Sequence, residues 1–579
     1  MALRICLVTP FAWSQPHDVN EHVAGVAQEL RALGHAVTIL ASSNRAADLA
    51  AGRAALRAGS AGDGQLIALG PAVPISRRSR VGVPVGARTN LELALESGRF
   101  DVVHGFEPAL PSLSYLALRH AKSLAVATFL SPERLGYPPG KAQRERFVGR
   151  IDALLATSEE TARAAGERFP GDYRIVSEGV DTVLFEPTAK EQRIVVELGP
   201  SDRRLVRAVL HEVAALDGWT LTLLRTRTPS TRPYVPRALA GRVEVRTARD
   251  GLARAAIFND AAVFVPAPDG VPRLRLEAAA AGAALASPPR AHEQPQLAAA
   301  EMGRLAEDGA YLARRSADAR AAAMGESFAS VARELESIYE GLRSQRRATR
   351  RDADPLANRE WIVVDLHMHT NASHDCQVTP ALLLEQAEAE GLGAVAVTDH
   401  NVFTGAQEAV ELARGGDLIV IPGEEVKTDG QGEVIGLFLR EEIPRGMTFA
   451  ETIAAIKEQD GLVYMPHPFD RMHAIPEPAT LRRHLGDIDV FEVYNARLLF
   501  EGYNDEALRF ARKYNLTMGA GSDAHVLQGI GTGAVRMRAF ADPEEFVVSL
   551  RTAEILRRPK SLLYLQSLKW AAQAKERVR

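Results

Sequence analysis

Short apolar runs alternate with longer amphipathic stretches over the first part of the chain. Residues 3–9 form an apolar run, which is typical of a buried parallel strand. A helical pattern follows over 19–33, and a second apolar run covers 36–41 after Gly34. Strand, helix, glycine-containing turn and strand together make a βαβ unit. The pattern therefore predicts a Rossmann-like domain at the N-terminus.

The same alternation continues to about residue 129 and starts again near Tyr173. Further strands are expected at 124–129, 194–198, 220–224 and 261–266, and further helices at 112–120, 203–216, 274–281 and 328–342. We therefore expect two successive Rossmann-like α/β domains, covering residues 1–170 and 171–343.

Periodicity is lost in residues 344–360, which are charged and contain Pro355. This composition is typical of a linker. Its arginines would also suit a polyanion, although a solvated linker explains them more simply. Another apolar run begins at residue 361, so we place a third domain over 361–579.

Composition narrows the classes of protein that need to be considered. A length of 579 residues fits about three or four domains. The net charge of -4 gives no electrostatic reason to expect nucleic acid as the main partner. Cys6 and Cys376 are the only cysteines, which excludes a disulfide framework and fits a reducing compartment. We see neither a signal peptide nor a transmembrane run, so we expect a cytoplasmic protein; peripheral membrane contact stays open.

The third region begins with two histidines at the end of an apolar run. His367 and His369 are alternate residues, and alternate residues of a strand point to the same face. Two histidines on one face suit a metal ion, but an isolated pair is equally well explained by ordinary hydrogen bonding at a strand edge. Eight of the 15 histidines follow the linker, which favours the metal.

Other apolar runs in this region also end in metal-binding residue types. Because a barrel of parallel strands builds its site at the carboxyl ends of its strands, we expect these side chains to converge. The residues are Asp375 in a polar loop, His400 after Asp399, Glu424 and Glu425, His467 between two prolines, and Asp523 with His525.

Nitrogen and oxygen ligands without thiolate suit Zn, Mn or Fe, and carboxylates that bridge favour a cluster of two or three divalent ions. Such a cluster binds phosphate, clamps the attacking and leaving oxygens, and lowers the pKa of a bound water to roughly 7. The sequence therefore predicts metal-dependent hydrolysis of a phosphoester.

Residues 361 to about 535 resemble a PHP (polymerase and histidinol phosphatase) domain. The matching segments are Asp-Leu-His-Met-His-Thr, Val-Thr-Asp-His, Pro-Gly-Glu-Glu-Val, Met-Pro-His-Pro and Gly-Ser-Asp-Ala-His. The resemblance implies a distorted (β/α)7 barrel with two or three metal ions. It implies as ligands His367, His369, Asp375, His400, Glu425, His467, Asp523 and His525. Among these, Glu425 is the expected bridging carboxylate, and Glu425, Asp523 and His525 are the groups expected to matter most for catalysis.

Two positions depart from the family pattern. Many relatives have histidine where Glu433 stands, and some place a ligand where Asn495 stands. Arg471 and Arg497 follow two of the ligand segments, and each is either a bidentate phosphate contact or a solvent-facing arginine.

Residues 1–345 resemble family-4 glycosyltransferases of GT-B fold, of the phosphatidylinositol mannosyltransferase type. The matching segments include Leu-Gly-His-Ala-Val-Thr-Ile-Leu-Ala, Phe-Asp-Val-Val-His-Gly-Phe-Glu-Pro, Gly-Val-Asp-Thr-Val-Leu-Phe-Glu-Pro and Leu-Glu-Ala-Ala-Ala-Ala-Gly. The resemblance implies a donor-sugar site at Asp269 and Glu277.

Several catalytic features of that family are altered. His17 and Asp18 replace a glycine pair, and Phe106 and Leu130 replace histidines. The segment 199–202 replaces the start of a cationic diphosphate site, where Arg203 or Arg204 would have to substitute. Without its cations and glycines the site should bind a diphosphate weakly.

Three hypotheses remain. The first is a metal-dependent phosphoesterase that carries a degenerate glycosyltransferase-like module. The second is a bifunctional enzyme in which the glycosyltransferase also works, and the third is a non-catalytic binding protein. The expected substrate is a phosphorylated small molecule or a short oligonucleotide. A nucleotide sugar or glycolipid is the expected ligand of the N-terminal module.

Overall fold

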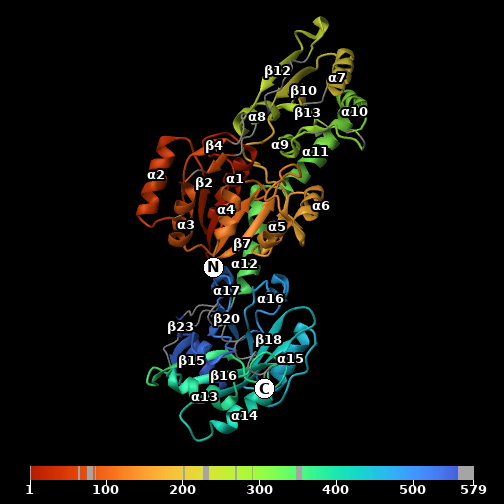
Figure 1. Cartoon of the computed structure of the whole chain (residues 1–579). Helices are drawn as coiled ribbons and strands as arrows, with labels where there is room; N and C mark the ends of the chain where they lie inside the picture. The colour runs from red at the N-terminus through yellow and green to blue at the C-terminus, as the bar shows by residue number, and fades with distance from the viewer. Residues whose placement is uncertain are drawn as a thin grey trace. The chain divides into compact units, whose positions relative to one another are not determined.

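The computed structural model describes residues 2–62, 65–74, 82–84, 86–199, 203–225, 234–267, 270–289, 291, 293–346 and 355–558. The chain divides into two compact units, Met1–Leu342 (unit 1) and Arg343–Arg579 (unit 2), and each is described by itself (Figure 1). The finer division at residue 170 stays a prediction, and residues 347–354 of the expected linker lie outside the described residues.

The first half of unit 1 is built on a seven-stranded parallel sheet with the order β3-β2-β1-β6-β7-β8-β9. Its strands are β1 Arg4–Val8, β2 Ala36–Ala41, β3 Leu66–Ala68, β6 Val102–Phe106, β7 Leu124–Phe129, β8 Ala153–Ala156 and β9 Tyr173–Ile175. Its helices are α1 Asp18–Ala32, α2 Ala46–Arg57, α3 Ala87–Gly98, α4 Leu113–His120, α5 Lys141–Val148 and α6 Glu159–Arg168. A small hairpin pairs β4 Ala72–Pro74 with β5 Gly82–Pro84.

The second half of unit 1 has a five-stranded parallel sheet with the order β12-β11-β10-β13-β14. Its strands are β10 Glu191–Glu197, β11 Thr220–Arg225, β12 Val243–Thr247, β13 Ala261–Val265 and β14 Ala284–Leu285. Its helices are α7 Arg203–Ala215, α8 Gly251–Phe258, α9 Pro272–Ala280, α10 Pro295–Glu307 and α11 Gly309–Gly325, with a 3-10 turn η1 at Arg237–Leu239. Two doubly wound halves confirm the expected GT-B type of α/β fold.

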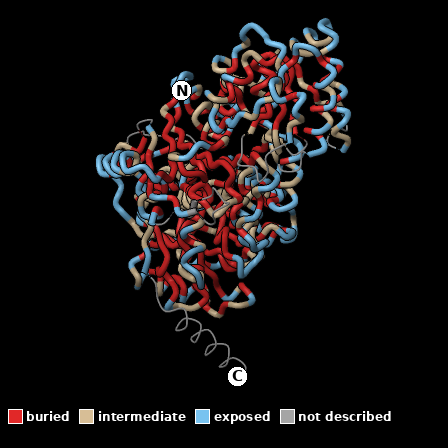
Figure 2. Tube along the Cα trace, turned by 90° about the horizontal axis from the view of Figure 1, so that it is seen from above, coloured by how far each residue is buried: buried red, intermediate tan, exposed pale blue. Residues whose placement is uncertain are grey.

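Helix periodicity explains how the elements of unit 1 pack. In α1 the residues Val19, Val23, Val26 and Leu30 are all buried, which is the spacing of one helix face. The closing helix α12, Phe328–Ser344, returns to the first half, where the Tyr339 hydroxyl lies 2.6 Å from His104 Nδ1. Figure 2 shows buried residues, in red, mainly in the interior of the trace and exposed residues, in pale blue, mainly along its outside.

Unit 2 is built on a nine-stranded sheet with the order β21-β20-β19-β18-β17-β16-β15-β22-β23. Its strands are β15 Trp361–Met368, β16 Ala394–His400, β17 Ile419–Lys427, β18 Glu433–Leu437, β19 Leu462–Met465, β20 Val490–Asn495, β21 Met518–Gly521, β22 Gly533–Arg538 and β23 Glu554–Arg557. Its helices are α13 Pro380–Ala389, α14 Thr404–Leu412, α15 Phe449–Glu458, α16 Pro478–Arg483, α17 Glu501–Tyr514 and α18 Pro543–Leu550, with a 3-10 turn η2 at Leu527–Gly529.

The sheet of unit 2 curls into a nearly closed barrel. The Asp523 N–H donates to the His367 carbonyl at 2.7 Å, and the His369 N–H donates to the Ala524 carbonyl at 3.1 Å. These bonds join the end of β15 to the loop after β21, and so bring together the first and last of the strands that run from β15 to β21 in the sheet. The neighbours of β18, namely β17 and β19, pair with it antiparallel, as does β15 with β22. The expected distorted barrel is therefore confirmed, with antiparallel strands as the distortion.

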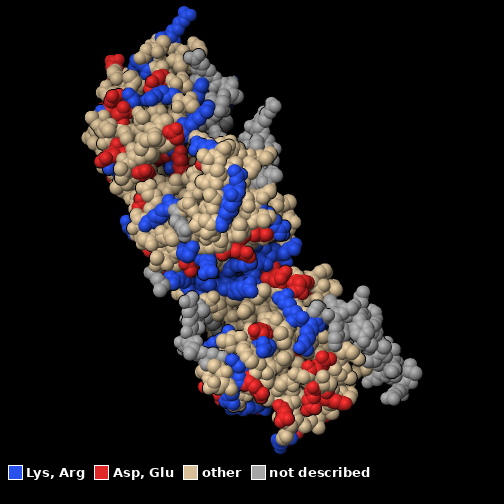
Figure 3. All heavy atoms as spheres, turned by 90° about the vertical axis from the view of Figure 1, so that its left-hand side faces the viewer, with Lys and Arg blue, Asp and Glu red and all other residues tan. Residues whose placement is uncertain are grey.

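Charged side chains of both signs lie on the surface of the molecule. On the face drawn in Figure 3, acidic and basic side chains both occur, in keeping with the net charge of -4. Within the described ranges, no helix has the length and apolar character that crossing a membrane requires.

Candidate metal centre

Two histidines at the end of β15 begin the site. His367 and His369 are fully buried, and they leave the strand on the same face. The backbone bonds that close the barrel hold this strand end against Asp523. The sequence pattern therefore places two imidazoles and a carboxylate together, as expected.

Glu425 is the carboxylate around which the histidines gather. Its Oε2 lies 3.4 Å from His367 Nε2, 3.5 Å from His369 Nε2 and 3.0 Å from His400 Nδ1. Its Oε1 lies 2.9 Å from His467 Nε2. Burial opposes ionisation of this carboxyl, but His367 and His400 outweigh burial and hold the pKa of Glu425 well below its usual range.

Glu424 lies on the other face of the strand. Both glutamates fall inside β17 rather than after it, because β17 continues as the partner of β18. The Glu424 carboxylate accepts the Ile443 N–H at 2.8 Å, and burial raises the pKa of Glu424 to about 7. The structure thus brings Glu425, and not Glu424, to the histidines.

The loops after β15 and β21 supply the remaining acidic groups. Asp523 Oδ1 lies 3.4 Å from His369 Nε2. Asp375 Oδ2 lies 3.0 Å from His525 Nε2, and its Oδ1 lies 3.8 Å from His400 Nε2. All eight predicted ligand residues therefore come together at one end of the barrel.

We call these residues the histidine–carboxylate cluster: His367, His369, Asp375, His400, Glu425, His467, Asp523 and His525. Several trios in it offer ligand atoms that lie within 4.8 Å of one another. They are His369 with His400 and His525, His367 with His467 and Asp523, and His367 with His369 and Glu425.

Three buried atoms of the cluster test whether a metal fits. His367 Nε2, His369 Nε2 and Glu425 Oε2 are enclosed and, among the described residues, have no hydrogen-bond partner of acceptable geometry. An unsatisfied buried polar atom costs about 1–3 kcal/mol, and more when charged. The donor set is nitrogen and oxygen without sulfur, which suits Zn, Mn or Fe. The residues therefore fit a cluster of divalent transition-metal ions.

Two residues of the cluster have strained backbones. His467 has φ of 23° and Asp523 has φ of 50°, and neither is glycine. Positive φ is unfavourable for residues with a side chain and persists only where the surrounding structure enforces it. This strain supports a functional role for the two strand ends that carry His467 and Asp523.

Glu492 is a residue of the site that the sequence reasoning missed. It lies within β20, fully buried, and its Oε1 lies 3.2 Å from His367 Nδ1. It also accepts the Tyr464 hydroxyl at 2.8 Å and the His467 N–H at 2.6 Å. A carboxylate on the far nitrogen of a histidine fixes the ring and its tautomer, which leaves Nε2 for a metal. The only signal in the sequence is one acidic residue inside an apolar strand.

A second supporting group holds His369. Asp399 accepts the Ser373 hydroxyl at 2.6 Å and the Thr370 hydroxyl at 2.7 Å. The Ser373 hydroxyl in turn lies 3.3 Å from His369 Nδ1. Asp399 therefore positions the loop after β15 rather than joining the cluster.

The two candidate phosphate-binding arginines differ in placement. Arg497 Nη1 lies 3.1 Å from Asp523 Oδ1 and 3.3 Å from His525 Nε2. Burial lowers the pKa of Arg497, but Asp523 and Asp375 outweigh burial and raise it. Arg471 is exposed, and among the described residues no hydrogen bond or ion pair joins it to the cluster.

Unit 1 presents a different arrangement at its expected donor site. Glu277 of α9 is fully buried, and its two carboxylate oxygens accept hydrogen bonds from Arg254 at 2.6 and 2.7 Å and from Arg273 at 2.9 Å. Arg254 also donates to Glu21 of α1 at 2.6 Å. We call these four residues the buried ion-pair network. Asp269 lies outside the described residues.

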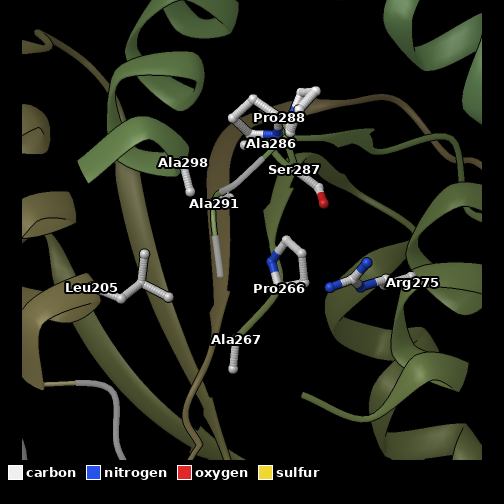
Figure 4. A pocket seen from close by; sticks show the side chains of 10 residues that line it. Leu205, Pro266, Ala267, Arg275, Ala286, Ser287, Pro288, Ala291 and Ala298 are labelled. Carbon is white, nitrogen blue, oxygen red and sulfur yellow. The ribbon is translucent and has the colours of Figure 1, made fainter. Parts of the chain in front are cut away.

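A cavity of about 280 Å³ lies at the carboxyl ends of β13 and β14. Among the described residues that line it, Arg275 is the one with a charge, and Figure 4 shows Leu205 and Arg275 on opposite sides of Pro266. Arg203 and Arg204, the proposed substitute cations, are exposed at the first residues of α7. One guanidinium beside apolar walls is a weak match for a diphosphate.

Comparison with known families finds three matching segments. Glycosyltransferase Family 4 matches residues 19–184, the PHP domain matches 365–488, and a PHP-associated segment matches 501–555. The PHP match begins two residues before His367 and includes six residues of the cluster.

The chain is also similar to individual proteins. An uncharacterised protein of Methanocaldococcus jannaschii is 35% identical over 213 residues, which are 34% of this chain and 84% of that protein. A phosphatidyl-myo-inositol mannosyltransferase of Propionibacterium freudenreichii is 32% identical over 212 residues, which are 34% of this chain and 54% of that enzyme. A solved candidate metal-dependent phosphoesterase from Bifidobacterium adolescentis has 18% identity and a TM-score of 0.26, over 34% of this chain and 97% of that one.

Proposed function

The chain belongs to the PHP family in its C-terminal region and to glycosyltransferase family 4 in its N-terminal region, and from this premise we propose that it hydrolyses a phosphoester at the histidine–carboxylate cluster. The observation that carries the proposal is the set of buried, unsatisfied ligand atoms on His367, His369 and Glu425. The substrate class we propose is a phosphorylated small molecule or a short oligonucleotide. Cytoplasmic location stays a prediction.

The proposed ligands are the eight residues of the cluster, with Glu425 as the bridging carboxylate. Its two oxygens face different histidines, with Oε2 toward His400 and Oε1 toward His467, which is what a bridge between two ions requires. Two or three ions of Mn, Zn or Fe would neutralise the phosphate and lower the pKa of the attacking water to roughly 7.

The protein's own groups then have separate tasks. Arg497 pairs with Asp523 and approaches Asp375 at the edge of the cluster, so a phosphate bound to the cluster would lie near a guanidinium that can bind two of its oxygens in bidentate fashion. Glu492 keeps His367 oriented, and the Asp399–Ser373 pair does the same for His369. Arg471 is exposed, so of the two arginines Arg497 is the stronger candidate for substrate binding.

For unit 1 we propose a glycosyltransferase scaffold that no longer transfers sugar. Glu277 is committed to Arg254 and Arg273. At the end of β10, Glu197 accepts the N–H groups of Ala267 and Val271 at 3.2 and 2.8 Å. These N–H groups precede and begin helix α9, where an anionic ligand would otherwise bind. Here they already donate to the carboxylate of Glu197. The alternative is a bifunctional enzyme, and the acidic Glu277 and the cavity at the carboxyl ends of β13 and β14 are the features that favour it.

Two assays test these proposals together. The full chain is incubated with Mn²⁺ and a panel of phosphomonoesters, nucleotides and short oligonucleotides, and phosphate or nucleotide release is measured. Release of product supports the phosphoesterase, and no release from any class contradicts it. Calorimetric titration with nucleotide sugars distinguishes an inactive scaffold in unit 1 from an active glycosyltransferase. A measurable affinity would favour the bifunctional enzyme.

We also propose that unit 2 is separable from unit 1. A chain that starts near Pro355 should fold alone, because it begins within the expected linker at 344–360 and contains all of the domain that follows. An insoluble fragment without cooperative unfolding, beside a well-behaved full chain, would mean that the boundary is wrong or that the domains depend on each other.

A further inference from the structure

Glu433 is an acidic residue of unit 2 that lies outside the eight expected ligands. It is the first residue of β18, which pairs antiparallel with β17. Lys427 is its direct partner across the pair, and Glu425 is the partner of Ile435. Directly opposed residues share a face, as do residues two apart on one strand. Glu433 and Glu425 therefore project from neighbouring strands to the same side, into the barrel.

The Glu433 carboxylate reaches the cluster from that position. Glu433, Glu425 and His400 offer ligand atoms that all lie within 4.8 Å of one another. Glu433 Oε2 also lies 3.8 Å from His467 Nε2. The Glu433 side chain is 20% accessible, and within the described ranges no lysine or arginine forms an ion pair with it. The two carboxylates thus lie close to each other, beside the imidazoles of His400 and His467.

Two like charges at this distance repel each other, and partial burial makes the repulsion stronger. A divalent cation between them removes this cost. The neighbouring Glu425 Oε2 is an independent sign that an ion belongs here, because it is buried and has no hydrogen-bond partner among the described residues. Asn495 offers no comparable ligand, since its side-chain amide donates to Glu492 at 3.1 Å and its side-chain carbonyl accepts the Arg497 N–H at 2.9 Å.

We propose that Glu433 is a metal ligand and that Glu425, Glu433 and His400 form an ion position that prefers a hard ion such as Mn²⁺ to Zn²⁺. Carboxylate oxygens suit Mn²⁺ and Mg²⁺, whereas imidazole suits Zn²⁺. His400 also belongs to a second position, made of three imidazoles, together with His369 and His525. The two positions therefore differ in ligand chemistry, and the cluster is selective for a mixture of ions. This inference rests on the proposed metal-dependent function.

The test compares metal binding by the full chain, stripped of metal, in four forms: wild type, Glu433→Gln, Glu433→His and Glu441→Gln. Glu441→Gln is the matched control, because Glu441 is exposed in the loop after β18. Each form is titrated calorimetrically with Mn²⁺ and separately with Zn²⁺. Bound ions are then counted by elemental analysis after dialysis against an equal mixture of both.

We expect Glu433→Gln to lose one bound Mn²⁺ per chain, or to bind it about tenfold or more weakly. Glu433→His should restore the ion count while replacing Mn²⁺ by Zn²⁺ at that position, and Glu441→Gln should match wild type. Wild-type counts and affinities in both Glu433 variants would overturn the inference. If the wild type binds neither ion, the proposed function fails instead. A circular-dichroism melt of each metal-free form checks folding, and Glu433→His carries the test if Glu433→Gln is unfolded.

Discussion

The histidine–carboxylate cluster of unit 2 and the buried ion-pair network of unit 1 use similar residue types to opposite effect. In the network, both oxygens of Glu277 accept hydrogen bonds from Arg254 and Arg273. In the cluster, His367 Nε2, His369 Nε2 and Glu425 Oε2 are buried without a hydrogen-bond partner. Both sites bury a glutamate, Glu277 in the network and Glu425 in the cluster, and they differ in whether its oxygens have hydrogen-bond partners.

Satisfied and unsatisfied groups have different physical consequences. A buried carboxylate with two guanidinium partners is neutralised inside the protein, and any ligand must first displace those partners. A buried imidazole with a free nitrogen is unfavourable until something binds it. In unit 1, Glu277 and its arginine partners join α8 and α9, and Arg254 joins them to α1 through Glu21. In unit 2, ligand atoms of the cluster have no hydrogen-bond partner among the described residues and are therefore available to bind an ion.

The largest expected effect is at Glu425. Glu425→Gln removes the charge that faces four histidines, so we expect hydrolysis at saturating Mn²⁺ to fall by about 100-fold or more. Glu424→Gln is the matched control, and a smaller loss is expected because Glu424 bonds to Ile443 on the other face. A dead Glu424→Gln beside an unchanged Glu425→Gln would place the bridging residue one position earlier.

A smaller effect is expected at Glu492, which orients His367 without belonging to the cluster. Glu492→Gln keeps the shape but weakens the hold on His367 Nδ1, so we expect metal affinity to fall by about 10–100-fold. Addition of excess Mn²⁺ should recover much of the rate. Glu544→Gln, an exposed change on α18, serves as the control. An affinity equal to wild type would show that Glu492 has only a structural role.

The two arginines should then separate by their effect on substrate binding. Arg497→Ala removes a cation that lies against Asp523, and we expect KM to rise by about tenfold, since hydrogen bonds to charged groups contribute about 1.5–3 kcal/mol. Arg471→Ala should change KM less, because Arg471 is exposed. Steady-state kinetics decide between them, and a larger effect at Arg471 would reverse the assignment.

The smallest effect on hydrolysis is expected at Glu277, although its effect on unit 1 is large. Glu277→Gln leaves Arg254 and Arg273 with the partly exposed Glu21 as counter-charge, which costs up to about 3–5 kcal/mol. The melting transition of unit 1 should shift to lower temperature while the phosphoesterase rate stays at the wild-type value. If that rate fell in a chain that is still folded, the two sites would be coupled and the comparison would fail.

Much of the metal centre was predictable because strand ends are visible in the sequence. His367, His400, His467 and Asp523 all follow or end apolar runs, and the carboxyl ends of neighbouring strands meet in a barrel. Glu492 and Asp399 were not predicted as supporting groups, since their roles depend on which histidine lies across the barrel. Glu433 showed only as a departure from the family pattern, because its reach to Glu425 depends on the β17–β18 register.

The two halves of unit 1 were predictable as α/β layers for the same reason, since their apolar strands and amphipathic helices alternate. The buried ion-pair network was not, because Glu21, Arg254 and Glu277 lie far apart in the sequence and meet only through the packing of α1, α8 and α9. The sequence showed that Phe106 and Leu130 replace histidines of the related family. It did not show that Glu277 pairs with Arg254 and Arg273.

The most direct test of the account is the metal dependence of hydrolysis by the full chain. The protein is stripped with a chelator, assayed on a phosphoester found in the substrate panel, and assayed again after stepwise addition of Mn²⁺ with the bound ions counted at each step. We predict no hydrolysis by the stripped chain and a rate that rises with the ions bound, to a limit at about two or three per chain. A rate that is the same with and without bound ions would contradict the central claim.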